Sequence, residues 1–346
     1  MQLRSSLMAA AVLAAATFSS AGAQVGGIAA EVRAKGETAP VGTAADDAAD
    51  DPAIWRNRRN PAASLIVATD KKAGLYLYGL DGRVRHFLGD GRLNNVDLID
   101  MGRAGVIVVA SDRNDVRAAK LRLYRLDTKA QRLVPLGSVS GGAGEAYGLC
   151  LARRGRDLDV YSVLKHGGVA QVRVKLSPAP SGVIVRQLTM ASQTEGCVVD
   201  PRSETLYVGE EDVGIWAFAA RASDPVQGRL VAPVDGQHLV ADVEGLAIAP
   251  KGRRGGWLVA SSQGDNAYAV YTLPDLKPAG RFRIAAGSFG ATEETDGIAL
   301  TLGSFGPDYP GGLFVAQDGI NGAAAQNFKL VSWADVLAAL GKAPVL

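Results

Sequence analysis

The segment Glu195-Gly196-Cys197-Val198-Val199 combines an acidic residue, a small residue and a run of apolar residues, and similar segments recur along the chain. The other copies are Asp51-Pro52-Ala53-Ile54-Trp55, Asn95-Val96-Asp97-Leu98-Ile99, Tyr147-Gly148-Leu149-Cys150-Leu151, Glu244-Gly245-Leu246-Ala247-Ile248 and Asp296-Gly297-Ile298-Ala299-Leu300. Their first residues are 44, 52, 48, 49 and 52 residues apart, so six units of nearly equal length fill residues 46–346.

Each unit contains further segments in which apolar and polar residues alternate, the period of two that is typical of β-strands. Second strands are expected at 64–69, 106–110, 205–209, 257–260 and 313–316, and third strands at 75–78, 121–124, 214–218 and 267–271. Units of about 48 residues with three or four strands match a propeller blade. The expected fold is therefore all-β, a six-bladed β-propeller. A parallel β-solenoid is the main alternative, but its repeats are usually shorter and the chain has no distinct caps.

The N-terminal residues predict export. Arg4, the apolar run 7–18 and Ala21-Gly22-Ala23 form the pattern of a signal peptide over residues 1–23, and the run is shorter than the ~20 residues of a membrane span. A periplasmic or extracellular protein, with no membrane partner after cleavage, is expected. Residues 24–45 precede the first unit, and the part from 26 to 43 is expected to add an outer strand to the last blade and close the ring.

The composition excludes several classes of protein. With 37 basic and 35 acidic residues interspersed along the chain, no nucleic-acid partner is expected. His86, His166 and His238 lack metal-ligand spacing, and no Gly-x-Ser-x-Gly nucleophile motif is present. Cys150 and Cys197 differ by one residue in their repeat position. Because successive strand residues point to opposite faces, two separate buried cysteines are favoured over a disulfide, although the pairing stays open.

Equivalent positions of a propeller's innermost strands meet at one rim, so side chains far apart in sequence converge. The starts of the units and the loops after the second strands carry many carboxylates, with Asn94, Asn95 and Gln263 beside them. These acids are Asp50, Asp51, Asp97, Glu195, Glu210, Glu211, Asp242, Glu244 and Asp296. Such a cluster needs cations, and oxygen ligands without His or Cys favour calcium.

The same loops carry Lys71, Lys72, Arg113 and Lys165, which suit a phosphate-bearing ligand. The alternative for each of these residues, taken alone, is that it is an ordinary solvent-exposed turn residue without a binding role.

Together these segments resemble the β-propeller phytases, the calcium-dependent alkaline phytases of bacteria. The similarity spans about residues 46–333 and rests on motifs in every blade. The motifs are 47–55 (DAADDPAIW), 93–98 (LNNVDL), 192–196 (SQTEG), 210–212 (EED), 242–246 (DVEGL), 261–264 (SSQG), 295–298 (TDGI) and 326–329 (QNFK). Ala325 stands where the family usually has asparagine.

The resemblance implies specific roles for residues of this sequence. Asp50, Asp51, Asp97, Glu195, Glu211, Asp242 and Glu244, with Gln263 beside them, would hold active-site calcium ions. Asp296, Gln326 and Asn327 would belong to a structural calcium site. Lys71, Lys72, Arg113, Tyr147 and Lys165 would bind substrate phosphates. The residues expected to act in catalysis are Glu195, Asp50, Asp51, Lys71, Arg113 and Tyr147.

The implied activity is that of a 3-phytase-type phosphatase, which removes phosphate stepwise from myo-inositol hexakisphosphate (phytate), preferably as its calcium complex. A calcium-bound water would attack phosphorus, so no protein nucleophile is needed. A monomer is expected. The alternatives are a metal-dependent propeller lactonase and a non-catalytic propeller that binds a partner on its rim.

Overall fold

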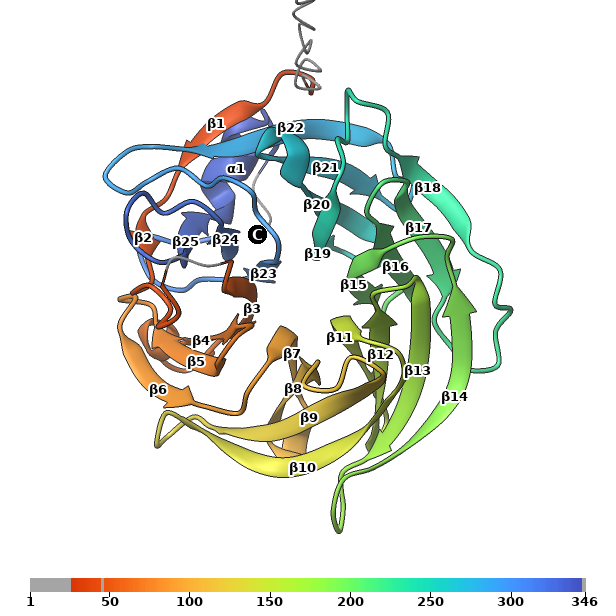
Figure 1. The fold of residues 1–346 in the computed structure, drawn as a ribbon. Coiled ribbons are helices and arrows are strands. Elements are labelled where there is room, and N and C mark those ends of the chain that lie inside the picture. Colours follow the sequence, from red (N-terminus) through yellow and green to blue (C-terminus); the bar gives the residue numbers. More distant parts are fainter. Residues whose placement is uncertain (1–25, 45–46, 344–346) are drawn as a thin grey trace, which may run out of the picture.

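Six β-sheets surround a central axis in the computed structural model of the protein, which describes residues 26–44 and 47–343 (Figure 1). The prediction of an all-β, six-bladed propeller is confirmed. The predicted signal peptide lies outside the described residues. Among the described residues, no helix is long and apolar enough to cross a membrane.

Each of the first four blades is a consecutive run of four antiparallel strands. The first two are β3 (Ala49–Trp55), β4 (Leu65–Asp70), β5 (Gly74–Gly79) and β6 (Val84–Leu88), then β7 (Leu93–Asp100), β8 (Val106–Asp112), β9 (Ala118–Asp127) and β10 (Arg132–Ala143). The next two are β11 (Ala146–Arg154), β12 (Asp157–Leu164), β13 (Gly168–Lys175) and β14 (Ser181–Thr189), then β15 (Thr194–Asp200), β16 (Thr205–Glu210), β17 (Gly214–Ala219) and β18 (Arg229–Pro233).

The last two blades also use strands from the N-terminal segment. The fifth blade contains β19 (Val243–Lys251), β20 (Gly255–Ser262), β21 (Ala267–Leu273) and β22 (Pro278–Ala285), to which β1 (Ala30–Arg33) adds in parallel. The sixth contains β23 (Ile298–Leu302), β24 (Gly312–Asp318) and β25 (Asn327–Ser332), and β2 (Gly36–Glu37) is its outer strand. Short 3₁₀ turns lie at Pro61–Ala63, Gly102–Ala104 and Gln263–Asp265, and α1 (Trp333–Ala339) follows β25.

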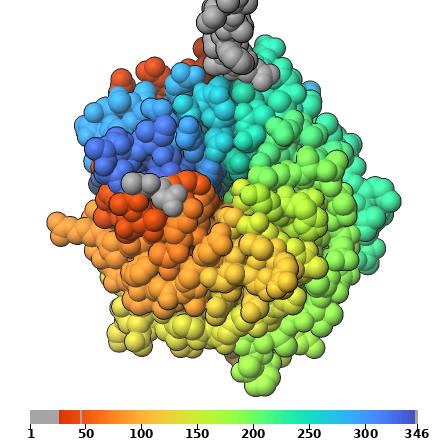
Figure 2. All heavy atoms as spheres, in the orientation of Figure 1, coloured from red at the N-terminus to blue at the C-terminus, as the bar shows by residue number. Residues whose placement is uncertain are grey.

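A buried ion pair joins the N-terminal segment to the last blade. The Lys329 ammonium is fully buried and lies 2.5 Å from Glu37 Oε2 of β2 and 3.0 Å from Asp318 Oδ2 of β24. In Figure 2 the red N-terminal segment lies against the blue C-terminal blade, so the first and last parts of the described chain meet at one side of the ring.

The apolar core lies between blades rather than inside any one sheet. Six large clusters of buried apolar residues each join two neighbouring blades, including the last and the first. Between the fifth and sixth blades, for example, Phe282, Phe314 and Trp333 are in aromatic contact. Because both faces of each sheet are covered, strands of alternating pattern are buried on both sides and the blades hold one another in place.

A β-bulge at the start of the innermost strand sets the direction of the rim side chains. In β15, Thr194 pairs with Glu210 and Cys197 with Val208, so three steps on β15 oppose two on β16. The innermost strands β3, β7, β11 and β19 have the same irregularity. Such bulges re-aim side chains at the rims of β-structures.

The pairing register corrects the alignment of the first two units. Counted from the bulge, the equivalents of Glu195 are Asp50, Asn94, Tyr147, Glu244 and, just before β23, Asp296. The alignment that started these units at Asp51 and Asn95 was therefore one residue late. The apolar pattern alone did not reveal this, because the bulge adds a residue outside the period of two.

Glycine follows four of these six positions because neighbouring innermost strands touch there. A Cβ atom on Gly148 would lie 1.8 Å from the Glu195 carbonyl oxygen, and one on Gly196 would lie 2.1 Å from the Glu244 carbonyl oxygen. Further round the ring, Gly245 N donates to Asp296 O and Gly297 N donates to Asp50 O, each at 2.9 Å. Hydrogen bonds thus link adjacent blades at the rim.

The interpretation of Cys150 and Cys197 as unpaired was wrong, because the structure contains a disulfide between them with a Cα–Cα distance of 5.6 Å. Their one-residue difference in phase is what brings them together. The third and fourth blades pack face to face. Residues that touch between them therefore lie on opposite faces of their own sheets, which is the relation that a one-residue difference in position produces. Both cysteines accordingly belong to the apolar cluster between these blades.

The role of the N-terminal segment gives a first prediction. Removal of residues 26–43 eliminates β1, β2 and the Glu37–Lys329 pair, so we expect a fall of several degrees in the midpoint of thermal unfolding, measured by calorimetry. Glu37→Gln should cause a smaller fall, because Asp318 still faces Lys329. The control begins at Gln24 and keeps the segment. Equal midpoints for the control and the deletion would contradict ring closure by this segment.

Candidate active site

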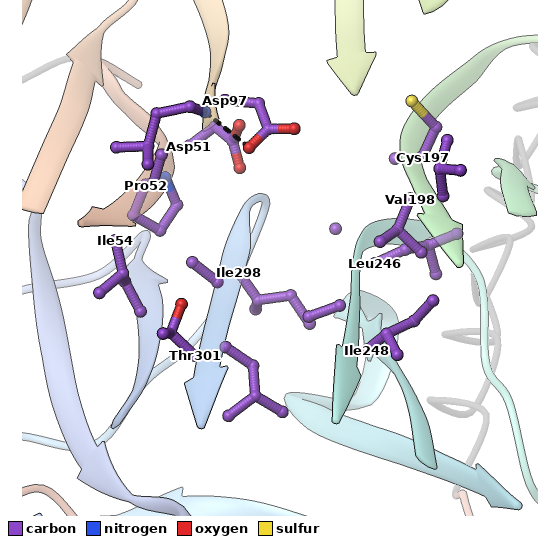
Figure 3. A pocket seen from close by; sticks show the side chains of 18 of the residues that line it. Asp51, Pro52, Ile54, Asp97, Cys197, Val198, Leu246, Ile248, Ile298 and Thr301 are labelled. Carbon is purple, nitrogen blue, oxygen red and sulfur yellow. Dashed lines mark hydrogen bonds between the residues drawn. The ribbon is translucent and has the colours of Figure 1, made fainter. Parts of the chain in front are cut away.

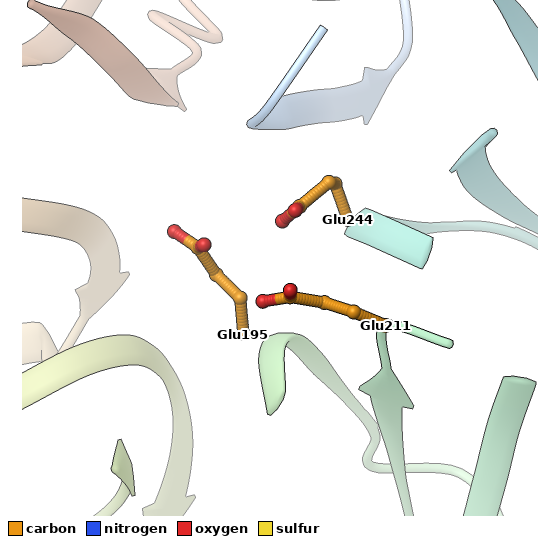
Figure 4. A group of neighbouring side chains, drawn as sticks. All are labelled: Glu195, Glu211 and Glu244. Carbon is orange, nitrogen blue, oxygen red and sulfur yellow. The ribbon is translucent and has the colours of Figure 1, made fainter. Parts of the chain in front are cut away.

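Three glutamates converge where the innermost strands of the fourth and fifth blades begin. Glu195 and Glu244 belong to β15 and β19, and Glu211 directly follows β16. One carboxylate oxygen from each lies within 4.8 Å of the others, and all three side chains are buried (Figure 4). This short separation requires either protons or a cation between the carboxylates.

Neighbouring rim residues extend the cluster and partly neutralise it. The buried Asn94 amide nitrogen donates to Asp50 Oδ2 at 3.0 Å and to Glu195 Oε1 at 2.8 Å. The Lys71 ammonium lies 2.9 Å from Asp50 Oδ1 and 3.1 Å from Asp296 Oδ2. A further ion pair to Asp47 and a hydrogen bond from Gln263 Nε2 to Asp296 Oδ1 complete this side of the rim.

Burial and like charge together disfavour ionisation of the carboxyl groups. Burial, and then the neighbouring Glu244 and Asp50, raise the pKa of Glu195 well above the usual carboxyl range. Burial and Asp296 do the same for the pKa of Glu244. Burial raises the pKa of Glu211 to about 7, and that of Asp296 to about 8 despite the adjacent Lys71. A bound cation would remove this penalty.

Two oxygens of the cluster lack a hydrogen-bond partner within the described chain. They are Glu211 Oε1 and Glu244 Oε2, and both are buried. Buried carboxylate oxygens are normally satisfied, and hard oxygen ligands in a group suit calcium. The residues present therefore fit a calcium ion between Glu195, Glu211 and Glu244.

A basic and aromatic group lies beside the carboxylates. Arg113 hydrogen-bonds to Asn94 and forms an ion pair with Glu145. The Tyr147 ring centroid lies 5.5 Å from the Arg113 guanidinium carbon and 5.1 Å from the Lys165 nitrogen. Burial, and then Glu195 and Glu244, raise the pKa of Tyr147, which keeps its phenol protonated. Three of the predicted phosphate-binding residues are thus adjacent.

Comparison with known proteins agrees with this arrangement. The family model described as Phytase matches residues 1–346. The chain belongs to the phytase family. A relative, the 3-phytase of Bacillus subtilis (strain 168), is 39% identical over 336 aligned positions, which cover 91% of this chain and 87% of the relative. The resemblance to phytases drawn from the motifs is confirmed.

Asp51 and Asp97, although predicted as calcium ligands, point toward the axial cavity below the rim. Both line this cavity of about 470 Å³, whose other walls are mostly apolar (Figure 3). Asp51 Oδ2 accepts from Val96 N at 3.0 Å, and the Asp97 oxygens accept from Leu98 N at 2.7 Å and Leu151 N at 3.0 Å. In this conformation each carboxylate links its blade to the next. Their roles as calcium ligands stay predictions.

Of the three residues assigned to a structural calcium site, two share a cavity and the third lies elsewhere. Asp296 and Gln326 line a polar cavity of about 510 Å³ together with Gln263 and Asp47, whereas Asn327 is absent from its lining. Gln326 Oε1 accepts from Ala48 N at 2.7 Å and from Ala49 N at 2.9 Å. Asn327 Oδ1 accepts from the Lys329 ammonium at 3.1 Å. The described contacts thus engage both amide oxygens.

Of the remaining predicted residues, Asp242 and Lys165 lie close enough to Glu211 to influence its pKa. Like charge from Asp242 contributes to the raised pKa of Glu211, and Lys165 lowers it. The Lys72 backbone N–H donates to Asp70 Oδ1. Glu210, in contrast, accepts from Ser192 and Trp216 and supports the loop rather than the cluster.

Sequence reasoning did not assign site roles to Glu145 and Gln193, and it noted Asn94 only as a neighbour. Gln193 Nε2 donates to the Tyr147 hydroxyl at 3.3 Å. For Asn94 the signal was available, since its corrected repeat position is that of Glu195.

A substitution in the glutamate group gives the second prediction. Glu244→Gln removes like charge from the metal-free protein, and it would also remove one of the predicted calcium ligands. We therefore expect its thermal midpoint to exceed that of the wild type by a few degrees in chelator and to fall below it in excess calcium. Glu210→Gln is the matched control, because Glu210 binds Ser192 and Trp216 outside the glutamate group, so its effect should be the same in both buffers. The same sign of change for Glu244→Gln in both buffers would contradict a shared cation.

Proposed function

We propose that the chain is a calcium-dependent phytase, which releases phosphate stepwise from phytate. Membership of the phytase family supports the substrate class and the phosphomonoesterase reaction. The main support for a calcium requirement is the group of three buried glutamates, in which two carboxylate oxygens have no hydrogen-bond partner in the described chain. The basic group beside them supports phosphate as the ligand.

Glu195, Glu211 and Glu244 would hold calcium, with Asp50 and Asp296 next to them. Bound calcium neutralises phosphate charge and lowers the pKa of water in its coordination sphere. The protein side chains then have three tasks: they position the phosphate, hold the carboxylates in place and supply protons.

The residues around Tyr147 are arranged to position the phosphate and to supply protons. Arg113 is held by Asn94 and Glu145, so its guanidinium is pre-oriented before a phosphate arrives. Lys165 also lies over the Tyr147 ring and adds a second positive charge. Because the pKa of Tyr147 is raised, its hydroxyl can donate a hydrogen bond to a phosphate oxygen at neutral and alkaline pH.

Lys71 and Asn94 hold the carboxylates in place. Lys71 balances the charge of Asp50 and Asp296, and Asn94 bridges Asp50 and Glu195 by donating a hydrogen bond to each. No specific observation favours the two alternatives: a lactonase gives the basic group no purpose, and a non-catalytic binding propeller has little need for carboxylates repeated at the starts of the blades. Export through residues 1–23, a monomeric state and preference for calcium phytate belong to the same proposal.

Metal removal is the direct test of the calcium requirement. We expect excess chelator to abolish phosphate release from phytate and added calcium to restore it, with magnesium restoring much less, because magnesium demands a smaller octahedral site. Inorganic phosphate is measured at neutral pH. Full activity after removal of calcium would contradict the proposal.

Two substitutions separate the carboxylate and basic groups. Glu195→Gln should lower kcat by about 100-fold or more while the protein remains folded, since it weakens the group at the reacting phosphate. Arg113→Ala should mainly raise KM, by roughly tenfold, because it removes a phosphate contact. Arg125→Ala, an exposed change on β9, serves as the control. Equal effects of the first two substitutions on kcat and KM would refute this division.

A further inference from the structure

The two ends of the propeller differ in charge. The innermost strands start at the rim that holds Glu195 and Glu244 and end at hairpins on the opposite face, as the pairings Thr194–Glu210 and Asp200–Thr205 show. We call the opposite surface, formed by the hairpins 56–64, 100–105, 153–157, 200–204, 251–254 and 303–311, the hairpin face. Its side chains are predominantly basic.

Eleven basic residues stand against five acidic ones in these six hairpins. The acidic ones are Asp100, Asp157, Asp200, Glu204 and Asp308. The basic ones are Arg56, Arg58, Arg59, Arg103, Arg153, Arg154, Arg156, Arg202, Lys251, Arg253 and Arg254. The near-neutral total of the chain therefore conceals a separation: carboxylates gather at one end of the propeller and arginines at the other.

Most of the arginines on this face are exposed and not engaged by the protein. Among the described residues, six arginines of the hairpin face form neither an ion pair nor a side-chain hydrogen bond, namely Arg58, Arg59, Arg103, Arg156, Arg253 and Arg254. A hollow of about 910 Å³ between the second and third blades is lined by Arg103, Arg153, Arg156 and Lys175, with Asp157 as its single acidic residue. Unpaired positive charge around a hollow attracts anionic groups.

We propose that the hairpin face binds an anionic lipid surface and orients the glutamate rim toward solution. These six arginines come from the first, second, third and fifth blades, so the positive charge is spread over four of the six blades. A bilayer of anionic headgroups matches such a distribution. The hollow between the second and third blades would receive a phosphate headgroup. A soluble substrate would then approach the site from the free side.

The apolar residues argue for a lipid headgroup surface over a protein partner. The large apolar side chains that are exposed in the described chain are Ile28, Val84, Phe87, Val116, Val183, Ile184, Val226, Leu230 and Ile320, and none lies in the six hairpins. Protein interfaces usually have an apolar or aromatic centre. Attachment through arginines alone is electrostatic and must weaken as the salt concentration rises.

Co-sedimentation with lipid vesicles tests this proposal. In calcium-free buffer of about 50 mM salt, the purified protein should bind phosphatidylcholine vesicles that contain about 40% phosphatidylglycerol, but not pure phosphatidylcholine, and about 0.5 M salt should release it. The triple variant Arg103→Glu, Arg156→Glu and Arg254→Glu should bind at least tenfold more weakly. The matched control, Arg33→Glu, Lys120→Glu and Arg283→Glu, changes exposed residues outside the hairpin face, has the same net charge and should retain most of the binding.

The outcomes separate this proposal from the proposed activity. Both triple variants should release phosphate from phytate at wild-type rates, since none of these residues belongs to the site. Equal loss of vesicle binding in the two variants would show an effect of net charge only and overturn the proposal. So would no binding by the wild type, or binding of soluble inorganic polyphosphate without binding of vesicles.

Discussion

The close contact of neighbouring innermost strands is the constraint on which the site depends. At Gly148 and Gly196 the backbone of the next blade occupies the space that a Cβ atom would need, and at Gly245 and Gly297 the strands are joined by hydrogen bonds. This contact, together with the bulge that precedes it, places residues from different blades side by side. Carboxylates separated by about 50 residues in the chain thereby become neighbours.

That proximity has an electrostatic cost, which the surrounding residues offset only in part. Lys71 balances Asp50 and Asp296, and Asn94 donates to Asp50 and Glu195. Glu211 and Glu244 each keep a buried oxygen without a partner in the described chain. The folded protein thus holds buried carboxylates whose negative charge is only partly balanced. In the proposed function, calcium would balance the remaining charge, and the basic group around Tyr147 would bind the phosphate.

The sequence predicts the fold better than the details of the site. Five spacings of 44 to 52 residues between six similar segments sufficed to predict the propeller, because each blade repeats one strand pattern. The first residue of each of the first two units was not predicted correctly. The β-bulge adds one residue to the innermost strand, and the alternation of apolar and polar residues does not reveal it. Cys150 and Cys197 were misjudged because alternation within one sheet says nothing about two sheets packed face to face. Asp51, Asp97 and Gln326 accept hydrogen bonds from backbone N–H groups of distant segments. No local sequence pattern predicts such contacts.

A crystal structure of the protein grown with calcium would test the central claim most directly. An anomalous difference map should show a peak within about 2.3–2.6 Å of carboxylate oxygens from Glu195, Glu211 and Glu244, the usual distance for calcium and oxygen. Carboxyl groups that instead hydrogen-bond to one another, with no anomalous peak between them at saturating calcium, would contradict it.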